Sequence, residues 1–184
     1  MPDSPSHPPR TASPSFADAL VTDAAAQALL TAYFSERALS FPAQQGRYRP
    51  AFPSAEQFVP PAGAFLLLRD PVLLRDPLLR SDAVADGFTG CGGIRRLDDG
   101  GLGAVRYEIK HLWLHPSTRG RGWGRALLVE LERRARGFGA TEVVLDTNAS
   151  LTAAGALYAS AGYVEIAPYN SNPNATTWYT KALA

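Results

Sequence analysis

The chain has 184 residues, of which 46% are hydrophobic, and its formal net charge is +1 at pH 7. A chain of this length can bury about two-thirds of its unfolded surface, so we expect one domain whose core needs neither disulfides nor a metal. The near-zero charge argues against a protein whose whole surface is adapted to nucleic acid or to an anionic membrane. Recognition of a phosphate would therefore have to be local.

Cys91 is the only cysteine and lies between Gly90 and Gly92. A single cysteine excludes an intrachain disulfide and a cysteine-based zinc site, and we interpret it as a buried, unreactive thiol. No apolar run approaches the roughly 18 residues that a membrane-spanning helix needs, and the first residues contain no apolar signal segment. We therefore expect a soluble cytoplasmic protein.

The first fifteen residues hold five prolines and four serines. Such a segment buries too little apolar area to offset the entropy that is lost when it becomes ordered. We therefore expect a disordered tail over residues 1–15 and a single folded domain over residues 16–184. The sequence of this domain contains no internal repeat.

The first regular element after the tail is a helix. Apolar residues at helical spacing predict that it begins at Asp18 or Thr22 and ends at Leu39, because Pro42 interrupts the pattern. Residues 42–62 contain five prolines among aromatic side chains, which indicates an irregular or short helical segment.

The centre of the chain alternates strands with turns. Phe65–Arg69 is typical of a short apolar strand, and the connection over residues 70–87 repeats Arg-Asp-Pro, which breaks regular structure. Gly87–Leu97 and Ala104–Leu114 are typical of two further strands. The Asp-Asp-Gly-Gly turn at 98–101 predicts that these two strands form an antiparallel hairpin.

A helix follows the next glycine-rich turn. Its pattern places one apolar stripe along the helix, made of Leu127, Leu128, Leu131 and Ala135. The remaining segments are predicted, in chain order, as a buried strand, an alanine-rich helix and two closing strands: Thr141–Thr147, Thr152–Ser160, Tyr163–Ile166 and Thr177–Lys181.

The turn before the long helix alternates glycines with larger residues, in the order Arg119-Gly120-Arg121-Gly122-Trp123-Gly124-Arg125. A glycine-rich turn that opens a helix presents unpaired backbone N–H groups and the positive end of the helix dipole, and both attract anions. The alternative is a tight turn beside solvated arginines. Three alternate glycines at a junction between strand and helix favour a phosphate site.

Two common phosphate motifs do not fit this turn. A nucleoside-triphosphate loop needs a lysine after its last glycine, but Gly124 is followed by Arg125. A dinucleotide-binding fingerprint needs a glycine at the position that Arg125 occupies. The sequence therefore excludes both.

The segment RGRGWG at 119–124 matches the R/Q-x-x-G-x-G/A pyrophosphate motif of the GNAT superfamily of acyl-CoA N-acyltransferases. YEIKHLWLHP at 107–116 is similar to a segment of bacterial acetyltransferases of unassigned substrate, and LYASAGY at 157–163 resembles the L-Y-x-x-x-G-[FY] segment. The resemblance covers about two-thirds of the chain, from Phe65 to Leu183. It implies an α/β fold in which helices flank a mixed, mostly antiparallel sheet with splayed central strands.

The resemblance also implies where the acyl donor, acetyl-CoA by default, is bound. Leu112, Trp113 and Leu114 would separate from the strand at Val143–Thr147, and the pantetheine arm would pair with their exposed main chain. The main chain and arginines of the turn at 119–125 would hold the diphosphate.

Glu108 lies eleven residues before Arg119, where some members of the superfamily have a general-base glutamate. It would take a proton from the acceptor amine, directly or through a water, if partial burial makes it a stronger base. The alternative is an exposed strand residue paired with a cross-strand arginine, because alternation does not tell which face meets the cleft. His111 is a second candidate base, against a structural or solvated histidine. Lys110 is ambiguous for the same reason.

Three further roles follow from the resemblance. The Leu112 N–H would polarise the thioester carbonyl. Tyr158 would give a proton to the departing thiolate, because a tyrosine pKa of about 10 lies above that of a thiol; the alternative is a core tyrosine whose hydroxyl reaches the rim. Many members carry an asparagine where this chain has Leu151, and Asn148 is the candidate replacement beside the pantetheine.

The acceptor pocket has two candidate walls. One is a set of aromatic residues for which core packing is the alternative: Tyr33, Phe34, Phe41, Tyr48, Phe52 and Phe58. The other is the loop at 167–178, APYNSNPNATTW, which is otherwise a turn stiffened by proline.

The resemblance implies an N-acetyltransferase that moves an acetyl group from acetyl-CoA to a primary amine of a small molecule or peptide by direct attack. We expect it to work as a monomer or homodimer, without a metal, nucleic acid or membrane. The alternative is a non-catalytic acyl-CoA-binding regulatory module. A nucleic-acid site at 119–125 is disfavoured by the near-zero charge and the lack of aromatic interleaving.

Overall fold

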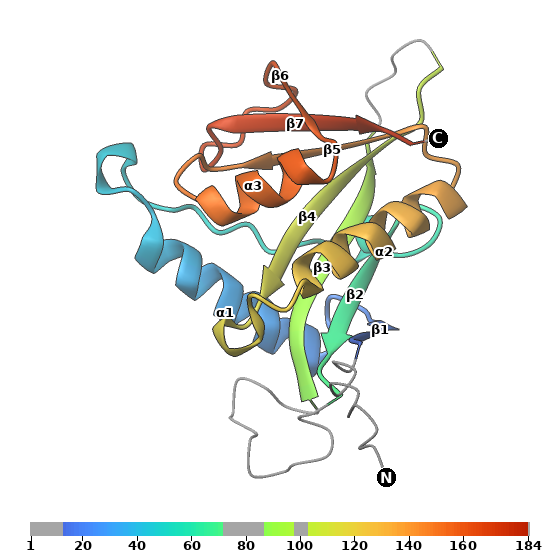
Figure 1. Cartoon of the computed structure of the whole chain (residues 1–184), viewed down its shortest axis with the longest axis horizontal. Helices are drawn as coiled ribbons and strands as arrows, with labels where there is room; N and C mark the ends of the chain where they lie inside the picture. The colour runs from blue at the N-terminus through green and yellow to red at the C-terminus, as the bar shows by residue number, and fades with distance from the viewer. Residues whose placement is uncertain (1–12, 72–86, 98–102, 184) are drawn as a thin grey trace, which may run out of the picture.

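The computed structural model describes residues 13–71, 87–97 and 103–183. Within these ranges, seven strands form one sheet in the order β1-β2-β3-β4-β5-β7-β6 (Figure 1). The strands are β1 (Ser15–Asp18), β2 (Gly63–Arg69), β3 (Phe88–Leu97), β4 (Arg106–Leu114), β5 (Glu142–Thr147), β6 (Val164–Ile166) and β7 (Thr177–Ala182). Only the β4–β5 pair is parallel among them, which confirms the mixed, mostly antiparallel sheet.

The first strand is absent from the sequence-based prediction. β1 starts at Ser15, the last residue of the predicted tail, and pairs with β2 through contacts such as Phe16 opposite Leu68. Residues 1–12 of that tail, most of the connection over 70–87 and the turn at 98–101 lie outside the described residues. The two strands that flank this turn, β3 and β4, form the predicted antiparallel pair.

Helices cover both faces of the sheet (Figure 1). α1 (Ala24–Ser40) packs on one face, and α2 (Trp123–Gly137) and α3 (Thr152–Ser160) pack on the other. The proline-rich segment holds two short 3₁₀ turns, η1 (Ala43–Gln45) and η2 (Ala55–Phe58), as its composition indicates. No helix in the described ranges is long and apolar enough to cross a membrane.

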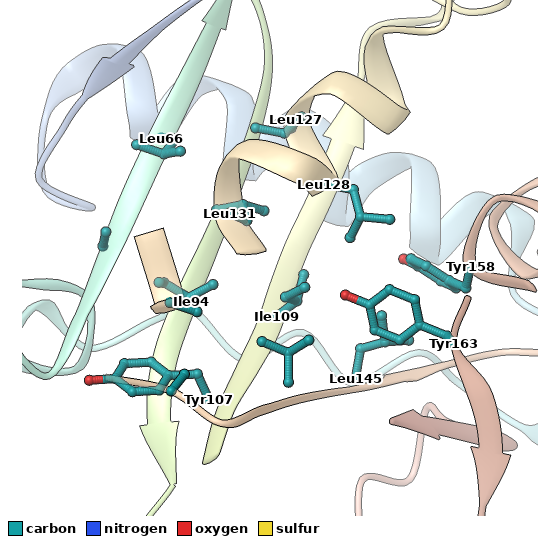
Figure 2. Close-up of a cluster of buried hydrophobic side chains, with 14 of the residues drawn as sticks. Leu66, Ile94, Tyr107, Ile109, Leu127, Leu128, Leu131, Leu145, Tyr158 and Tyr163 are labelled. Atoms are coloured by element: carbon teal, nitrogen blue, oxygen red, sulfur yellow. The ribbon is translucent and has the colours of Figure 1, made fainter. Parts of the chain in front are cut away.

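α2 supplies the centre of the larger core. Leu127, Leu128 and Leu131 are fully buried and lie on the predicted apolar stripe. Figure 2 shows them above Ile94 of β3 and Ile109 of β4, with which they form one hydrophobic cluster. This packing fixes α2, and the turn from which it starts, against the middle of the sheet.

β4 and β5 are paired over only three residue pairs, from Arg106–Glu142 to Glu108–Val144. β5 keeps its other partner throughout, because it pairs with β7 as far as Thr147 opposite Thr177. The second half of β4 therefore runs away from β5, and the two strands enclose a gap between them. The predicted splay is confirmed, and it starts directly after Glu108.

A β-bulge lies in β4 at the same level. Trp113 pairs with Cys91 and Lys110 pairs with Gly93, so that His111 and Leu112 together occupy the place of one residue in the ladder. His111 has a φ of 56°, in the left-handed region that non-glycine residues rarely adopt. Bulges of this kind bend a strand and redirect its main chain. Here the bend coincides with the gap between β4 and β5.

The packing of α2 leads to a stability prediction. Leu131→Ala should lower the free energy of unfolding by about 2–5 kcal/mol, because it leaves a cavity under a fully buried side chain. Val129→Ala in the same helix should change it by less than about 0.5 kcal/mol, since Val129 is half exposed. Urea unfolding followed by circular dichroism measures both. Equal effects of the two substitutions would contradict this orientation of α2.

Candidate active site

A cavity of about 540 Å³ opens at the gap between β4 and β5. Its walls come from α1, the proline-rich segment, β4, the end of β5, α3 and the loop between β6 and β7. Five of the six aromatic residues named from the sequence line it, namely Tyr33, Phe34, Tyr48, Phe52 and Phe58. Phe41, the sixth, is buried beside Tyr48, with 5.6 Å between the ring centroids.

The loop between β6 and β7 closes one side of this cavity with asparagines at alternate positions. The Oδ1 of Asn170 accepts from the N–H of Asn172, and the Oδ1 of Asn172 accepts from the N–H of Asn174. Asn174 in turn accepts from the N–H of Arg49 and donates to its carbonyl. These bonds give the loop a fixed shape and tie it to the proline-rich segment.

His111, on the bulge, points its ring into an aromatic wall. Its ring centroid lies 5.7 Å from that of Tyr33, 5.6 Å from Phe34 and 6.0 Å from Phe58. Burial, and then the positive charge of Lys110, lower the pKa of His111 from its usual value to about 3. The imidazole is therefore neutral at physiological pH and is a weak base, which disfavours His111 as the proton acceptor.

Glu108 is fully buried and its carboxylate is surrounded by donors. Arg95, its partner across β3 and β4, lies 2.6 Å from Oε2 through Nη2, and Lys110 lies 3.1 Å from Oε1. The Tyr169 hydroxyl donates to Oε1 at 2.9 Å and the Asn170 amide at 3.2 Å. The cross-strand arginine is thus present, but the exposed position of the alternative interpretation is not.

Asp146 faces the cavity in front of Glu108 and was not singled out by the sequence. Its carboxylate accepts two bonds of 3.0 Å from Lys110, one of 2.7 Å from Asn170 and one of 3.1 Å from Asn172. Burial alone would raise the pKa of Asp146, but Lys110 and the two amides outweigh it and hold the pKa below its usual value. Lys110 and Asn170 therefore bridge two carboxylates at the base of the cavity.

Tyr158, on α3, is buried and lines the cavity. Its ring packs against Tyr163 and Tyr179, with centroid distances of 5.8 and 5.9 Å, and Figure 2 shows it beside Tyr163 at the edge of the core. Burial, and then the negative charge of Asp146, raise the pKa of Tyr158 well above its usual value. The phenol carries its proton at neutral pH, as an ordinary tyrosine also does, and burial makes it a weaker acid than a tyrosine in water.

Two other residues of the predicted donor site, Leu112 and Asn148, also line the cavity, as does Leu151. Asn148 is buried, and its amide donates to the side chain of Gln45 at 2.6 Å and to the carbonyl of Asn174 at 3.0 Å. Asn148 thus holds the end of β5 against both neighbouring loops.

The glycine-rich turn lies at the start of α2. Gly120 and Gly122 have φ values of 76° and 77°, which L side chains rarely adopt, although neither position is crowded. Gly122 is the N-cap of α2 and provides no side-chain cap, so the N–H groups of Trp123 and Gly124 begin the helix without one. The residues present therefore fit a bound phosphate, which would supply the missing acceptors.

The arginines of this turn bind acidic or polar partners within the protein. Arg119 contacts both carboxylate oxygens of Glu36 on α1, at 2.6 and 2.7 Å, and its Nε donates to the carbonyl of Leu114 at 3.0 Å. Arg121 lies 3.2 Å from the carboxylate of Asp70. A ligand phosphate at the turn would compete with both carboxylates for these guanidinium groups.

The remaining residues that were predicted to bind the acyl donor hold the start of α2 and the end of β4 in place. Arg125 donates to the Ser160 hydroxyl at 2.6 Å, which links α2 to α3. Trp113 and Trp123 are buried on opposite faces of the sheet, and the Trp113 indole donates to Glu36 at 3.0 Å. The side chains of Trp113 and Trp123 are therefore packed inside the protein, and only the main chain of these two residues is placed to meet a ligand.

A sequence profile described as the acetyltransferase (GNAT) family matches residues 32–163. The chain belongs to this family. The match includes the turn at the start of α2, the splayed strands and Tyr158, so the family's use of acyl-CoA agrees with the geometry of the gap. GNAT proteins transfer acyl groups, and this chain is therefore assigned to the acyltransferases.

Solved structures of similar proteins span nearly the whole chain. A protein described as an acyl-CoA N-acyltransferase from Klebsiella pneumoniae is 26% identical, with a TM-score of 0.66 over 93% of this chain and 98% of that one. A GNAT acetyltransferase from Staphylococcus aureus is 15% identical, with a TM-score of 0.66 over 92% and 100% of the two chains. The second likeness shows the fold alone.

A curated relative from Azospirillum brasilense is described as an IAA acetyltransferase. It is 34% identical over 80 residues, which are 44% of this chain and 50% of the relative. The match thus spans half the length of that protein.

The Arg119–Glu36 pair leads to a prediction about CoA affinity. Glu36→Gln should lower the Kd for CoA about two- to fivefold, because it frees Arg119 for the diphosphate while the glutamine Oε1 can still accept from Trp113. Glu56→Gln, at an exposed site in η2, is the matched control. Isothermal titration calorimetry measures both. Weaker binding by Glu36→Gln would instead mean that Glu36 holds Arg119 in place for the ligand.

His111 leads to a prediction about pH. The folded protein keeps His111 neutral down to a pKa of about 3, whereas the unfolded chain binds this proton below about pH 6.5. Its contribution to stability is therefore complete above about pH 6.5 and is lost as the pH falls toward the folded pKa, by up to about 1.4 kcal/mol per pH unit. His111→Phe should remove this slope in urea unfolding between about pH 5 and pH 7. An unchanged slope would place the imidazole in contact with solvent.

Proposed function

We propose that the protein is an N-acetyltransferase that moves an acetyl group from acetyl-CoA to a primary amine of a small molecule or peptide by direct attack. One observation carries the proposal: the gap between β4 and β5 opens into a cavity lined by Leu112 and Tyr158, beside an uncapped, glycine-rich helix start. The description of the family as acetyltransferases and of the Azospirillum relative as an IAA acetyltransferase support acetyl as the transferred group.

The donor would be held mainly by main chain. The N–H groups at the start of α2 and the guanidinium groups of Arg119 and Arg121 would bind the diphosphate, and the unpaired edge of β4 would bind the pantetheine arm. When bound, acetyl-CoA supplies the activated thioester. The Leu112 N–H, turned by the bulge at the gap, would polarise its carbonyl and stabilise negative charge that develops there.

The chain's side chains would move two protons. Tyr158 would give its proton to the departing sulfur, because it lines the cavity and is protonated at neutral pH. The proton from the amine would pass through a water to Glu108, and Asp146, whose pKa is held below its usual value, would accept a hydrogen bond from that water rather than the proton. Asp146 lines the cavity and Glu108 lies behind it, joined through Lys110 and Asn170, so a water-mediated path fits better than direct contact with Glu108.

Tyr158→Phe should lower kcat about a hundredfold or more with little change in the Kd for CoA, because it removes the general acid and keeps the ring. Tyr163→Phe is the matched control: it loses a hydroxyl from the same cluster, but that hydroxyl donates to Glu132 and lies away from the cavity wall. Thiol release from acetyl-CoA, read across an amine library, measures turnover.

Two outcomes of this screen would change the proposal. Normal turnover by both Tyr158→Phe and Glu108→Gln would show that these residues do not carry the proton transfers. Tight binding of CoA without acetylation of any amine would favour the alternative function, a regulatory module that binds acyl-CoA.

A further inference from the structure

Arg37 is a buried cation in the wall of the acceptor side of the cavity. It lies one helical turn after Tyr33 on α1, so both side chains project from the same face of the helix. Only 6% of Arg37 is exposed. Its Nη1 donates to the Ser40 hydroxyl at 3.3 Å, and its guanidinium lies 5.8 Å from the centre of the Tyr48 ring.

Arg37 differs from the other buried cations of the cavity wall in its partners. Lys110 is neutralised by Asp146, and Arg95 by Glu108 behind the wall. Arg49 also lines the cavity, but it is exposed to solvent. Within the described part of the chain, Arg37 forms no ion pair with a carboxylate; its contacts are the neutral partners Ser40 and Tyr48.

A buried guanidinium without a counter-ion is costly, because burial removes the water that would otherwise solvate its charge. A charged hydrogen bond from an anion in the cavity would recover this energy. The phosphates of the donor are not that anion, since no residue of the turn at 119–125 lies in the described wall of this cavity. The charge on Arg37 therefore points to the acceptor.

We infer that the acceptor amine carries a carboxylate, and that Arg37 binds this carboxylate while the amine faces Leu112 and Tyr158. The inference rests on the proposed function, because it names the substrate class of the same site. A carboxylate also explains why a buried cation that is unpaired among the described residues, Arg37, lies in the wall that would receive an amine that is itself positive before it reacts.

The shared cavity indicates that the carboxylate and the amine lie close together in the acceptor. Tyr33, Arg37 and Tyr158 all line this cavity, and Tyr33 lies one helical turn before Arg37 on α1. The proposed anion site and the reaction centre are therefore parts of one cavity of about 540 Å³. Phe34 packs on Phe52, with 4.6 Å between the ring centroids, and both line the cavity. These two rings form an apolar wall that would face the rest of the acceptor. These features favour an amino acid with an apolar side chain and disfavour polyamines and lysine-rich peptides.

The test compares acceptors that differ only in the carboxylate. L-Phenylalanine, L-leucine and L-methionine are each assayed with acetyl-CoA against the decarboxylated amine and the amino-acid amide. The wild type should use the carboxylates with about ten- to hundredfold higher kcat/KM. Arg37→Gln should abolish this preference mainly through KM, whereas Arg47→Gln, at an exposed arginine of the proline-rich segment, should keep it. Equal or better use of the decarboxylated amines by the wild type would overturn the inference.

Thermal unfolding separates binding from a structural role. Because Arg37 has no carboxylate partner to lose among the described residues, Arg37→Gln should have a Tm equal to or above that of the wild type. Arg37→Lys, which keeps the positive charge, should keep part of the preference for acceptors with a carboxylate. A large fall in Tm for both variants would mean that Arg37 serves the fold, which would overturn the inference.

A binding assay keeps the inference testable if the protein proves inactive. Calorimetry with N-acetyl-L-phenylalanine and with N-phenethylacetamide, each added to protein saturated with CoA, measures the carboxylate without turnover. Binding of the first alone, lost in Arg37→Gln, would support the anion site even if the proposed catalysis failed. Equal binding of both, or of neither, would overturn it.

Discussion

The separation of β4 from β5 is the constraint on which the other features of the site depend. Backbone pairing ends at Glu108–Val144, and the bulge at His111 turns the rest of β4 away while β5 remains paired with β7. Main-chain groups that a closed sheet would satisfy therefore face a gap inside the protein, where they need other partners. The cavity, its aromatic wall and the helix start all lie around these unpaired groups.

Internal ion pairs already occupy most of the charged groups of the site. Glu108 and Asp146 share Lys110, and Glu36 holds Arg119 at the turn where the diphosphate is proposed to bind. Ligands must therefore exchange with existing partners, which moderates the affinity that such charges provide. Arg37 differs because its neighbours in the described chain are neutral.

The sequence predicted those elements whose signals are local. The stripe along α2, the limits of α3 and the antiparallel pairing of β3 with β4 depend on periodicity and turn residues, and all three are confirmed. β1 was missed because four residues become a strand only through pairing with β2, more than 45 residues away. The setting of Glu108 was equally hidden, since Tyr169 reaches it from a loop 61 residues later. Asp146 acquires its importance from contacts with Lys110 and Asn170, and Arg37 from the cavity that distant segments of the chain form beside it.

Glu36 and Arg37 are adjacent on α1 but meet different sites: Glu36 contacts Arg119 in the turn before α2, and Arg37 lines the cavity. A donor that displaces Glu36 from Arg119 acts on the same helical turn that presents Arg37. Any change in acceptor affinity that results must be matched, by thermodynamic reciprocity, by an equal change in donor affinity. One short length of helix would thus couple the two sites, and the coupling would be the same whichever ligand binds first.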